Sequence, residues 1–133
     1  MPGSFLDTNV LVYLASGDPK KADRAEQLVA RGGMISVQVL NELANVARRK
    51  MHLSWDEIDE WLSTLRRLLT VVSLTLESHE RGLRLAQRYQ LSIYDAMIVA
   101  SALEAGCDTL WTEDLHGGAL FGESLRVVNP FQA

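Results

Sequence analysis

The sequence predicts a three-layer α/β/α sandwich, in which helices cover both faces of a central parallel sheet of four or five short strands. Short apolar segments alternate along the chain with longer segments of helical periodicity, and this order indicates strand–helix–strand crossovers. One of the helical segments is apolar almost all the way round, so it must be buried. The length of 133 residues suits one domain, residues 1–133, with one hydrophobic core.

The first part of the chain contains a short strand and two helices. We expect a buried strand over residues 4–6, then the polar turn Asp7-Thr8-Asn9 and a short helix over residues 10–14. Asp18-Pro19 then starts a longer helix, with the aspartate as N-cap and the proline at the first helical position. That helix should run to about Arg31 and end at Gly32-Gly33.

The middle of the chain repeats this order. Residues 34–36 form a brief strand, and apolar residues then recur at helical spacing to about Lys50. Ser54 and Glu57 have the spacing of a capping box and begin the next helix. Residues 70–73 are predicted as a third strand. The helix that begins after Ser54 has an apolar stripe, which comprises Trp55, Ile58, Trp61, Leu62, Leu65 and Leu69.

The last part of the chain contains the buried helix and the final strands. A helix from about residue 77 to 89 comes first, and Ser92 opens the apolar helix, for which Gly106 suits the C′ position. Residues 109–111 form a fourth strand and residues 126–128 a fifth. Parallel sheets place their sites beyond the carboxyl ends of the strands, so side chains at those ends are the functional candidates.

Four carboxylates lie at such positions. Asp7 directly follows the first strand, and Asp114 comes just past the fourth; Glu42 and Asp95 lie near the starts of helices beside strands. Each has a structural explanation as well: a helix cap for Asp7, a turn for Asp114, and a solvated helix edge for Glu42. Asp95 could belong to a capping box with Ser92, but its face is apolar, so we expect it to need a cation or several donors.

Convergence of the four acids predicts a metal site. Two carboxylates about 4 Å apart repel by roughly 4 kcal/mol at an effective dielectric constant near 20, so four need positive charge. An all-oxygen site suits Mg²⁺ or Mn²⁺, with one or two ions. His52, His79 and His116 show no paired zinc spacing, and Cys107, the only cysteine, is interpreted as a small core residue.

Composition limits the class of protein. The net charge of −4 argues against binding nucleic acid by bulk electrostatics, although a metal ion would cancel part of that charge at the site itself. The sequence contains no signal peptide and no apolar stretch long enough to span a membrane. A single cysteine fits a reducing compartment, so we expect a cytoplasmic protein.

Four segments of the chain, taken together, point to a known family: FLDTNVLVY, SVQVLNELANVARRK, YDAMIVASALEAGC and TEDLHGG…RVVNPF. They resemble the PIN domain, and more narrowly the VapC-type toxins of bacterial toxin–antitoxin pairs. The resemblance covers nearly the whole chain in order and implies a PIN-like sheet, Mg²⁺-dependent endonucleolytic cleavage of RNA, inhibition by a small antitoxin, and a homodimer. By this resemblance Asp7, Glu42, Asp95 and Asp114 take the four acidic positions, while Thr8, Asn9 and Thr112 support them.

We expect metal-assisted hydrolysis of phosphodiester bonds, in which no side chain acts as nucleophile. Two basic groups are candidate RNA contacts, with solvated helix faces as the alternative interpretation. They are Arg48, Arg49 and Lys50 at the end of the Glu42 helix, and Arg81, Arg84 and Arg88 at spacings of three and four residues.

Three other functions stay open at this point. An aspartate-nucleophile phosphatase needs a second aspartate two residues after the first, and here that residue is Asn9. A PIN nuclease acting in RNA processing or on DNA flaps, without an antitoxin, would carry the same four acids. A non-catalytic module could use the same cleft to bind a ligand.

Overall fold

The computed structural model describes residues 3–115, 117–122 and 124–132, so His116 lies outside the described residues. The order of elements confirms the predicted alternation of strands and helices. The strands are β1 Ser4–Leu6, β2 Met34–Ser36, β3 Thr70–Val72, β4 Thr109–Trp111, β5 Leu120–Phe121 and β6 Leu125–Val128. The helices are α1 Thr8–Val12, the 3₁₀ turn η1 Tyr13–Ala15, α2 Pro19–Ala30, α3 Val37–Arg49, α4 Trp55–Leu68, α5 Leu76–Tyr89 and α6 Ile93–Glu104.

The sheet contains six strands over the described residues, in the order β3-β2-β1-β4-β6-β5, rather than the four or five predicted. The five longer strands are parallel, with Phe5 opposite both Met34 and Leu110. The additional strand, β5, pairs antiparallel with β6 at the edge of the sheet. A strand of two residues is too short to leave a periodic pattern in the sequence, which is why it was missed.

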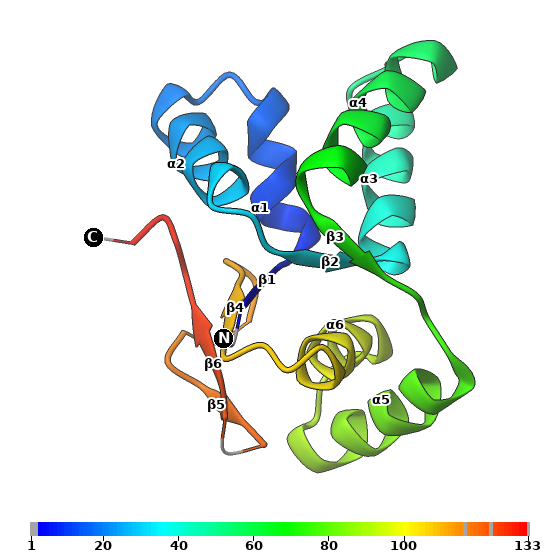
Figure 1. Ribbon diagram of the computed structural model, residues 1–133, viewed down its shortest axis with the longest axis vertical. Helices are drawn as coiled ribbons and strands as arrows, with labels where there is room; N and C mark the ends of the chain where they lie inside the picture. Colours follow the sequence, from blue (N-terminus) through cyan, green and yellow to red (C-terminus); the bar gives the residue numbers. More distant parts are fainter. Residues whose placement is uncertain (1–2, 116, 123, 133) are drawn as a thin grey trace.

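Helices cover both faces of the sheet, as predicted. Helices α1 to α4 lie on one side and α5 and α6 on the other (Figure 1). The central strand β1 lies between β2 and β4, with Phe5 and Leu6 fully buried. Helix α6 carries the buried stretch Ile98–Ala102, as its apolar sequence indicated, and Gly106 beyond its end has a φ of +74°.

The predicted helix starts are confirmed where capping residues indicated them. Asp18 accepts a hydrogen bond from the backbone of Lys21, and Ser54 with Glu57 forms a complete capping box. The first helix begins two residues earlier than predicted, at Thr8, because Asp7 acts as its N-cap and accepts from the Thr8 N–H. The turn that follows the first strand is therefore already helical.

Trp55 departs from the predicted apolar stripe of α4. Its side chain is 60% exposed and lies beneath the Arg48 guanidinium, 4.7 Å from the ring centroid. A position at the first residue of a helix, beyond the packed interface, explains the exposure. Ile58 and Leu65 are buried as the stripe predicted. No described helix is long and apolar enough to cross a membrane.

Candidate active site

A pocket of about 380 Å³ lies beyond the carboxyl ends of β1 and β4, and all four sequence-predicted acids line it. Faces of three helices form its walls. Asn9 and Tyr13 lie one turn apart on the α1–η1 segment, Glu42 and Val46 lie one turn apart on α3, and Asp95 and Ile98 lie three residues apart on α6. The parallel-sheet rule therefore predicted correctly that the four acids would meet at one edge of the sheet. The lining residues are Asp7, Thr8, Asn9, Val12, Tyr13, Glu42, Val46, Lys50, Asp95, Ile98, Glu113 and Asp114.

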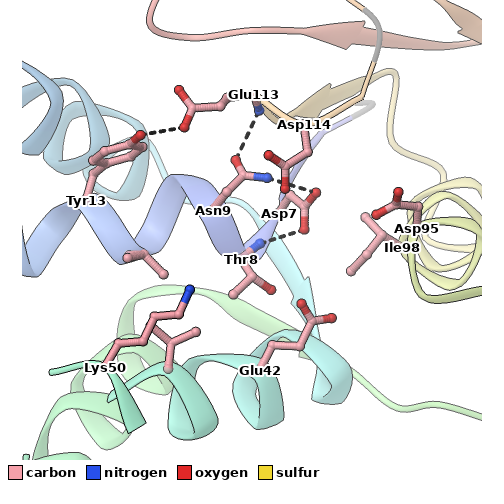
Figure 2. A pocket seen from close by; sticks show the side chains of 12 residues that line it. Asp7, Thr8, Asn9, Tyr13, Glu42, Lys50, Asp95, Ile98, Glu113 and Asp114 are labelled. Carbon is pink, nitrogen blue, oxygen red and sulfur yellow. Dashed lines mark hydrogen bonds between the residues drawn. The ribbon is translucent and has the colours of Figure 1, made fainter. Parts of the chain in front are cut away.

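Asp7 is the buried carboxylate of this pocket, with 5% of its surface exposed. Three donors reach it: the Thr8 N–H at 2.7 Å, the Thr112 hydroxyl at 2.8 Å and the Asn9 side-chain amide at 3.2 Å. Thr8 and Asn9 approach from α1 (Figure 2), and Thr112 approaches from the end of β4. These bonds fix the orientation of the Asp7 carboxylate before any ligand binds.

Burial dominates the acidity of Asp7. Desolvation raises its pKa from 3.8 to about 6, because removal from water penalises the charged form. The hydrogen bonds from Thr112 and Thr8 oppose that shift, while the negative charges of Glu42 and Asp95 add to it. Asp7 is thus a carboxylate whose ionised form is costly unless a positive charge comes near.

The turn after β4 is tied to this carboxylate. Thr112, which is fully buried, also accepts a hydrogen bond from the Asp114 N–H at 3.2 Å and one from the Asn9 side chain at 3.0 Å. The Asn9 carbonyl oxygen accepts in turn from the Glu113 N–H at 3.0 Å. Asn9 and Thr112 therefore join β1 to β4 at the base of the pocket.

Glu42 enters the pocket from α3, which begins at the N-cap Ser36 immediately after β2. Gln38 lies one turn before it and donates to the Glu42 carboxylate at 2.7 Å. The same amide nitrogen donates to the backbone carbonyl of Tyr94 at 3.0 Å. Gln38 thus links the Glu42 side chain to the start of α6, where Asp95 lies.

Asp95 occupies the first turn of α6, and its N–H donates to the N-cap hydroxyl of Ser92 at 3.1 Å. The apolar face of its helix led us to expect Asp95 to lose solvation. Asp95 is half-buried, because a helix start emerges from the core at the sheet edge, whereas Asp7 is buried. Figure 2 shows Asp95 and Glu42 facing the pocket from two different helices, α6 and α3.

The donor set fits a hard divalent cation. Four carboxylates from four separate segments face one pocket, and oxygen ligands are those that Mg²⁺ and Mn²⁺ prefer. The buried hydroxyl of Thr8, also at the pocket, has no hydrogen-bond partner among the described residues. Within that same part of the chain, no three histidine, cysteine or acidic side chains lie close enough together to hold one ion. Binding would therefore require the carboxylates to turn toward one another.

The six basic residues proposed as RNA contacts occupy different places in the structure. Lys50 lines the pocket, and Figure 2 shows its ammonium pointing into it from the end of α3. Arg48 instead donates to the Leu53 carbonyl and covers Trp55, and Arg49 is exposed outside the pocket lining. Arg81, Arg84 and Arg88 lie on α5; the first two line another groove, together with Glu77, Glu80 and Glu104.

The sequence prediction missed Tyr13 and Glu113. Tyr13 donates a hydrogen bond to the Glu113 carboxylate, and Glu113 also forms an ion pair with Lys21 at 3.1 Å. Spacing alone could have indicated Tyr13, which follows Asn9 by one helical turn. The contact between Lys21 on α2 and Glu113 joins residues far apart in the chain, so the local sequence does not indicate it. Hydrogen bonds to Tyr13 and Glu113 raise the pKa of Lys21, so it stays a cation.

Cys107 takes no part in the site. It is buried next to β4, and its thiol lies 3.5 Å from the Met34 sulfur. Burial raises the pKa of this thiol to about 11, so it stays protonated at neutral pH. The prediction that Cys107 is a small core residue is confirmed.

A sequence comparison identifies the family. The family model described as PIN domain matches residues 4–116, which hold all four pocket carboxylates predicted from the sequence. The chain belongs to the PIN domain family. No curated protein matches the sequence of this PIN domain.

Solved structures share the fold across nearly the whole chain. A chain of a toxin–antitoxin complex from Klebsiella pneumoniae is 23% identical, with a TM-score of 0.74, and covers 98% of this chain and 99% of its own. VapC20 of Mycobacterium tuberculosis, described as a sarcin-ricin loop cleaving toxin, is 20% identical with a TM-score of 0.66, covering 80% and 86%. A chain of DNA-bound VapBC from Salmonella typhimurium is 19% identical with a TM-score of 0.68, covering 96% and 97%. At these identities the likeness establishes the PIN fold.

Proposed function

We propose that this PIN domain is a metal-dependent endoribonuclease and the toxin component of a toxin–antitoxin pair. The observation that carries the proposal is the pocket itself, where Asp7, Glu42, Asp95 and Asp114 converge from four segments of the chain. A burial-raised pKa at Asp7 supports it, since perturbed acids concentrate at functional sites. RNA is favoured as substrate because one similar structure is a sarcin-ricin loop cleaving toxin.

The four carboxylates would hold Mg²⁺ or Mn²⁺, as one or two ions. When bound, the metal supplies Lewis-acid activation of water and of the phosphoryl oxygen. Asp7 contributes a ligand whose direction is set in advance by Thr8, Asn9 and Thr112, and such preset ligands reduce the ordering cost of binding. None of these side chains needs to act as a nucleophile.

Lys50 is the basic residue that we assign to the RNA backbone. Among the described residues that line the pocket, five are carboxylates and Lys50 is the one with a cationic side chain. It is the C-cap of α3, eight residues after Glu42 and about 12 Å farther along the helix axis, so it suits a phosphate of the RNA backbone away from the one being cleaved. It makes no ion pair with any described residue, so its charge is available to substrate.

The same comparison supports an antitoxin partner. One similar structure is a toxin–antitoxin complex and another is a VapBC complex, so we propose a small antitoxin as partner of this single domain, which would act in the cytoplasm where its RNA substrate lies. A homodimer is part of the proposal, and exposed leucines on α5, Leu76 and Leu83, are candidate contacts. Sedimentation of the purified chain, with and without substitution of both leucines by serine, would test it.

The central experiment is cleavage of RNA by purified, antitoxin-free protein. Total RNA and purified tRNA should be cut with Mg²⁺ and left intact with EDTA. Asp95→Asn, purified in the same way, should lower the rate about 100-fold or more, because metal-borne charge stabilisation is worth several kcal/mol and each 1.36 kcal/mol is a factor of ten. Asp23→Asn, at an exposed acid of α2, is the matched control. Intact RNA in every metal-loaded reaction would refute the proposal.

A further inference from the structure

Three side chains from separate elements meet at one end of the pocket and form a set that we call the Lys21 clamp: Tyr13, Lys21 and Glu113. The Tyr13 hydroxyl donates to one oxygen of the Glu113 carboxylate. The Lys21 ammonium donates to the other oxygen at 3.1 Å and to the Tyr13 hydroxyl oxygen at 3.1 Å. Each member thus contacts the other two.

Aromatic rings hold the lysine of the clamp in place. The Lys21 nitrogen lies 4.5 Å from the centroid of Tyr13 and 5.2 Å from that of Phe131, within the range of a cation–π interaction. The two rings pack edge to face at 4.8 Å. The side chains of Lys21 and Glu113 are only 33% and 26% exposed. This ion pair is therefore better ordered than the usual surface pair of long side chains.

The clamp acts on the turn that carries Asp114. The Glu113 N–H is bonded to Asn9 on the side of Asp7, whereas the Glu113 side chain turns away toward Tyr13 (Figure 2). Residue 113 is thus anchored at both its backbone and its carboxylate. Because peptide units are planar, anchoring residue 113 restricts the direction that Asp114 can take.

We propose that Tyr13 and Lys21 are positioning residues, which hold Glu113 out of the acid cluster and fix the turn that aims Asp114 at the metal. This inference rests on the proposed function. The competing assignment is Glu113 as a fifth metal ligand. Both of its carboxylate oxygens are already engaged, one by Tyr13 and one by Lys21, so a metal would have to break the clamp to recruit it. An ordered Asp114 also lowers the entropy lost when the ion binds.

The test uses Lys21→Met, with Lys20→Met as the matched control, since Lys20 is the exposed neighbour on α2 and lies outside the clamp. Two amides report on the turn in the metal-free chain, those of Glu113 and Asp114, which donate to Asn9 and Thr112. Lys21→Met should speed hydrogen exchange at these amides. It should also raise the half-saturating Mg²⁺ concentration about tenfold, in thermal shift and in RNA cleavage, with the maximum rate near that of wild type. Lys21→Arg should restore both values.

Tyr13→Phe removes a single hydroxyl from the clamp and tests the same effect in a chain that keeps its core. Glu113→Gln separates the two assignments, because a clamp residue affects the Mg²⁺ requirement, whereas a ligand affects the maximum rate. Unchanged exchange and unchanged Mg²⁺ dependence in both Lys21→Met and Tyr13→Phe would overturn the proposal, as would a Glu113→Gln chain inactive at saturating Mg²⁺. Failure of the proposed function would instead show as wild-type protein that Mg²⁺ neither activates nor stabilises, and the exchange rates would still decide whether the clamp orders the turn.

Discussion

Asp7→Asn should stabilise the metal-free protein while abolishing its response to metal. Burial raises the pKa of Asp7 from 3.8 to about 6, so at neutral pH the folded state bears the cost of a charge that the unfolded chain carries in water. A difference of this size corresponds to about 3 kcal/mol. Asparagine carries no charge and keeps an oxygen for the Thr8 N–H, although its amide group replaces the oxygen that accepts from both Thr112 and Asn9. Allowing about 1 kcal/mol for each of these two losses, we expect a net gain of about 1 kcal/mol.

The sign of the pH dependence follows from linkage. A raised pKa means that the folded state binds the proton more tightly, so stability is lost as the pH rises from about 3.8 to about 6. The advantage of Asp7→Asn should therefore be near its full value at pH 7.5 and close to zero or negative at pH 3.8 and below. The difference in the free energy of unfolding between variant and wild type isolates the effect of Asp7, because the other acids titrate in both chains.

The assay is urea unfolding in EDTA at pH 4 and at pH 7.5, repeated with Mg²⁺ at pH 7.5. A ligand at 100 times its dissociation constant adds about 2.7 kcal/mol to stability, and wild type should show such a gain while Asp7→Asn shows none. RNA cleavage by the variant should be lost. Two results would refute the reasoning about burial. One is an Asp7→Asn chain that is less stable than wild type at pH 7.5 in EDTA. The other is a difference in the free energy of unfolding between variant and wild type that is the same at both pH values.

Two further predictions test the remaining parts of the site. Lys50→Met should weaken binding of a fluorescein-labelled single-stranded RNA to the Asp95→Asn chain and reduce the salt slope of log K by about 0.7, the value for one phosphate contact, as measured by fluorescence anisotropy. Arg49→Met, at the neighbouring exposed position, should keep the slope, and an equal slope in Lys50→Met would exclude the contact. Thr112→Val removes a hydrogen bond that lowers the pKa of Asp7, so this pKa should rise above about 6 and the acidic limb of the pH–rate profile should move to higher pH. A limb that stays in place would show that Asp7 does not control it.

Local sequence was informative wherever a feature depended on neighbours in the chain. Asp18, Ser54 and Ser92 each cap the helix that the sequence placed after them, because a cap bonds to a backbone N–H only a few residues away. The positions of the four acids at one edge of the sheet also followed, since alternation of strand and helix determines where the carboxyl ends of parallel strands lie. The edge strand β5 did not follow, because its two residues pair only through contacts with β6.

The tertiary structure determined which side chains are buried and which side chains contact one another. The sequence by itself determined that Asp7, Glu42, Asp95 and Asp114 would share an edge, and it gave a reason for loss of solvation only at Asp95. In the structure Asp7 is the more buried of the two, between the start of α1 and the end of β4, because solvent exposure depends on which segments pack over a side chain and not only on the apolar residues of its own helix. The same reason explains the Lys21 clamp: Lys21 and Glu113 are 92 residues apart in the chain, and only the packing of α2 against the turn after β4 brings them into contact.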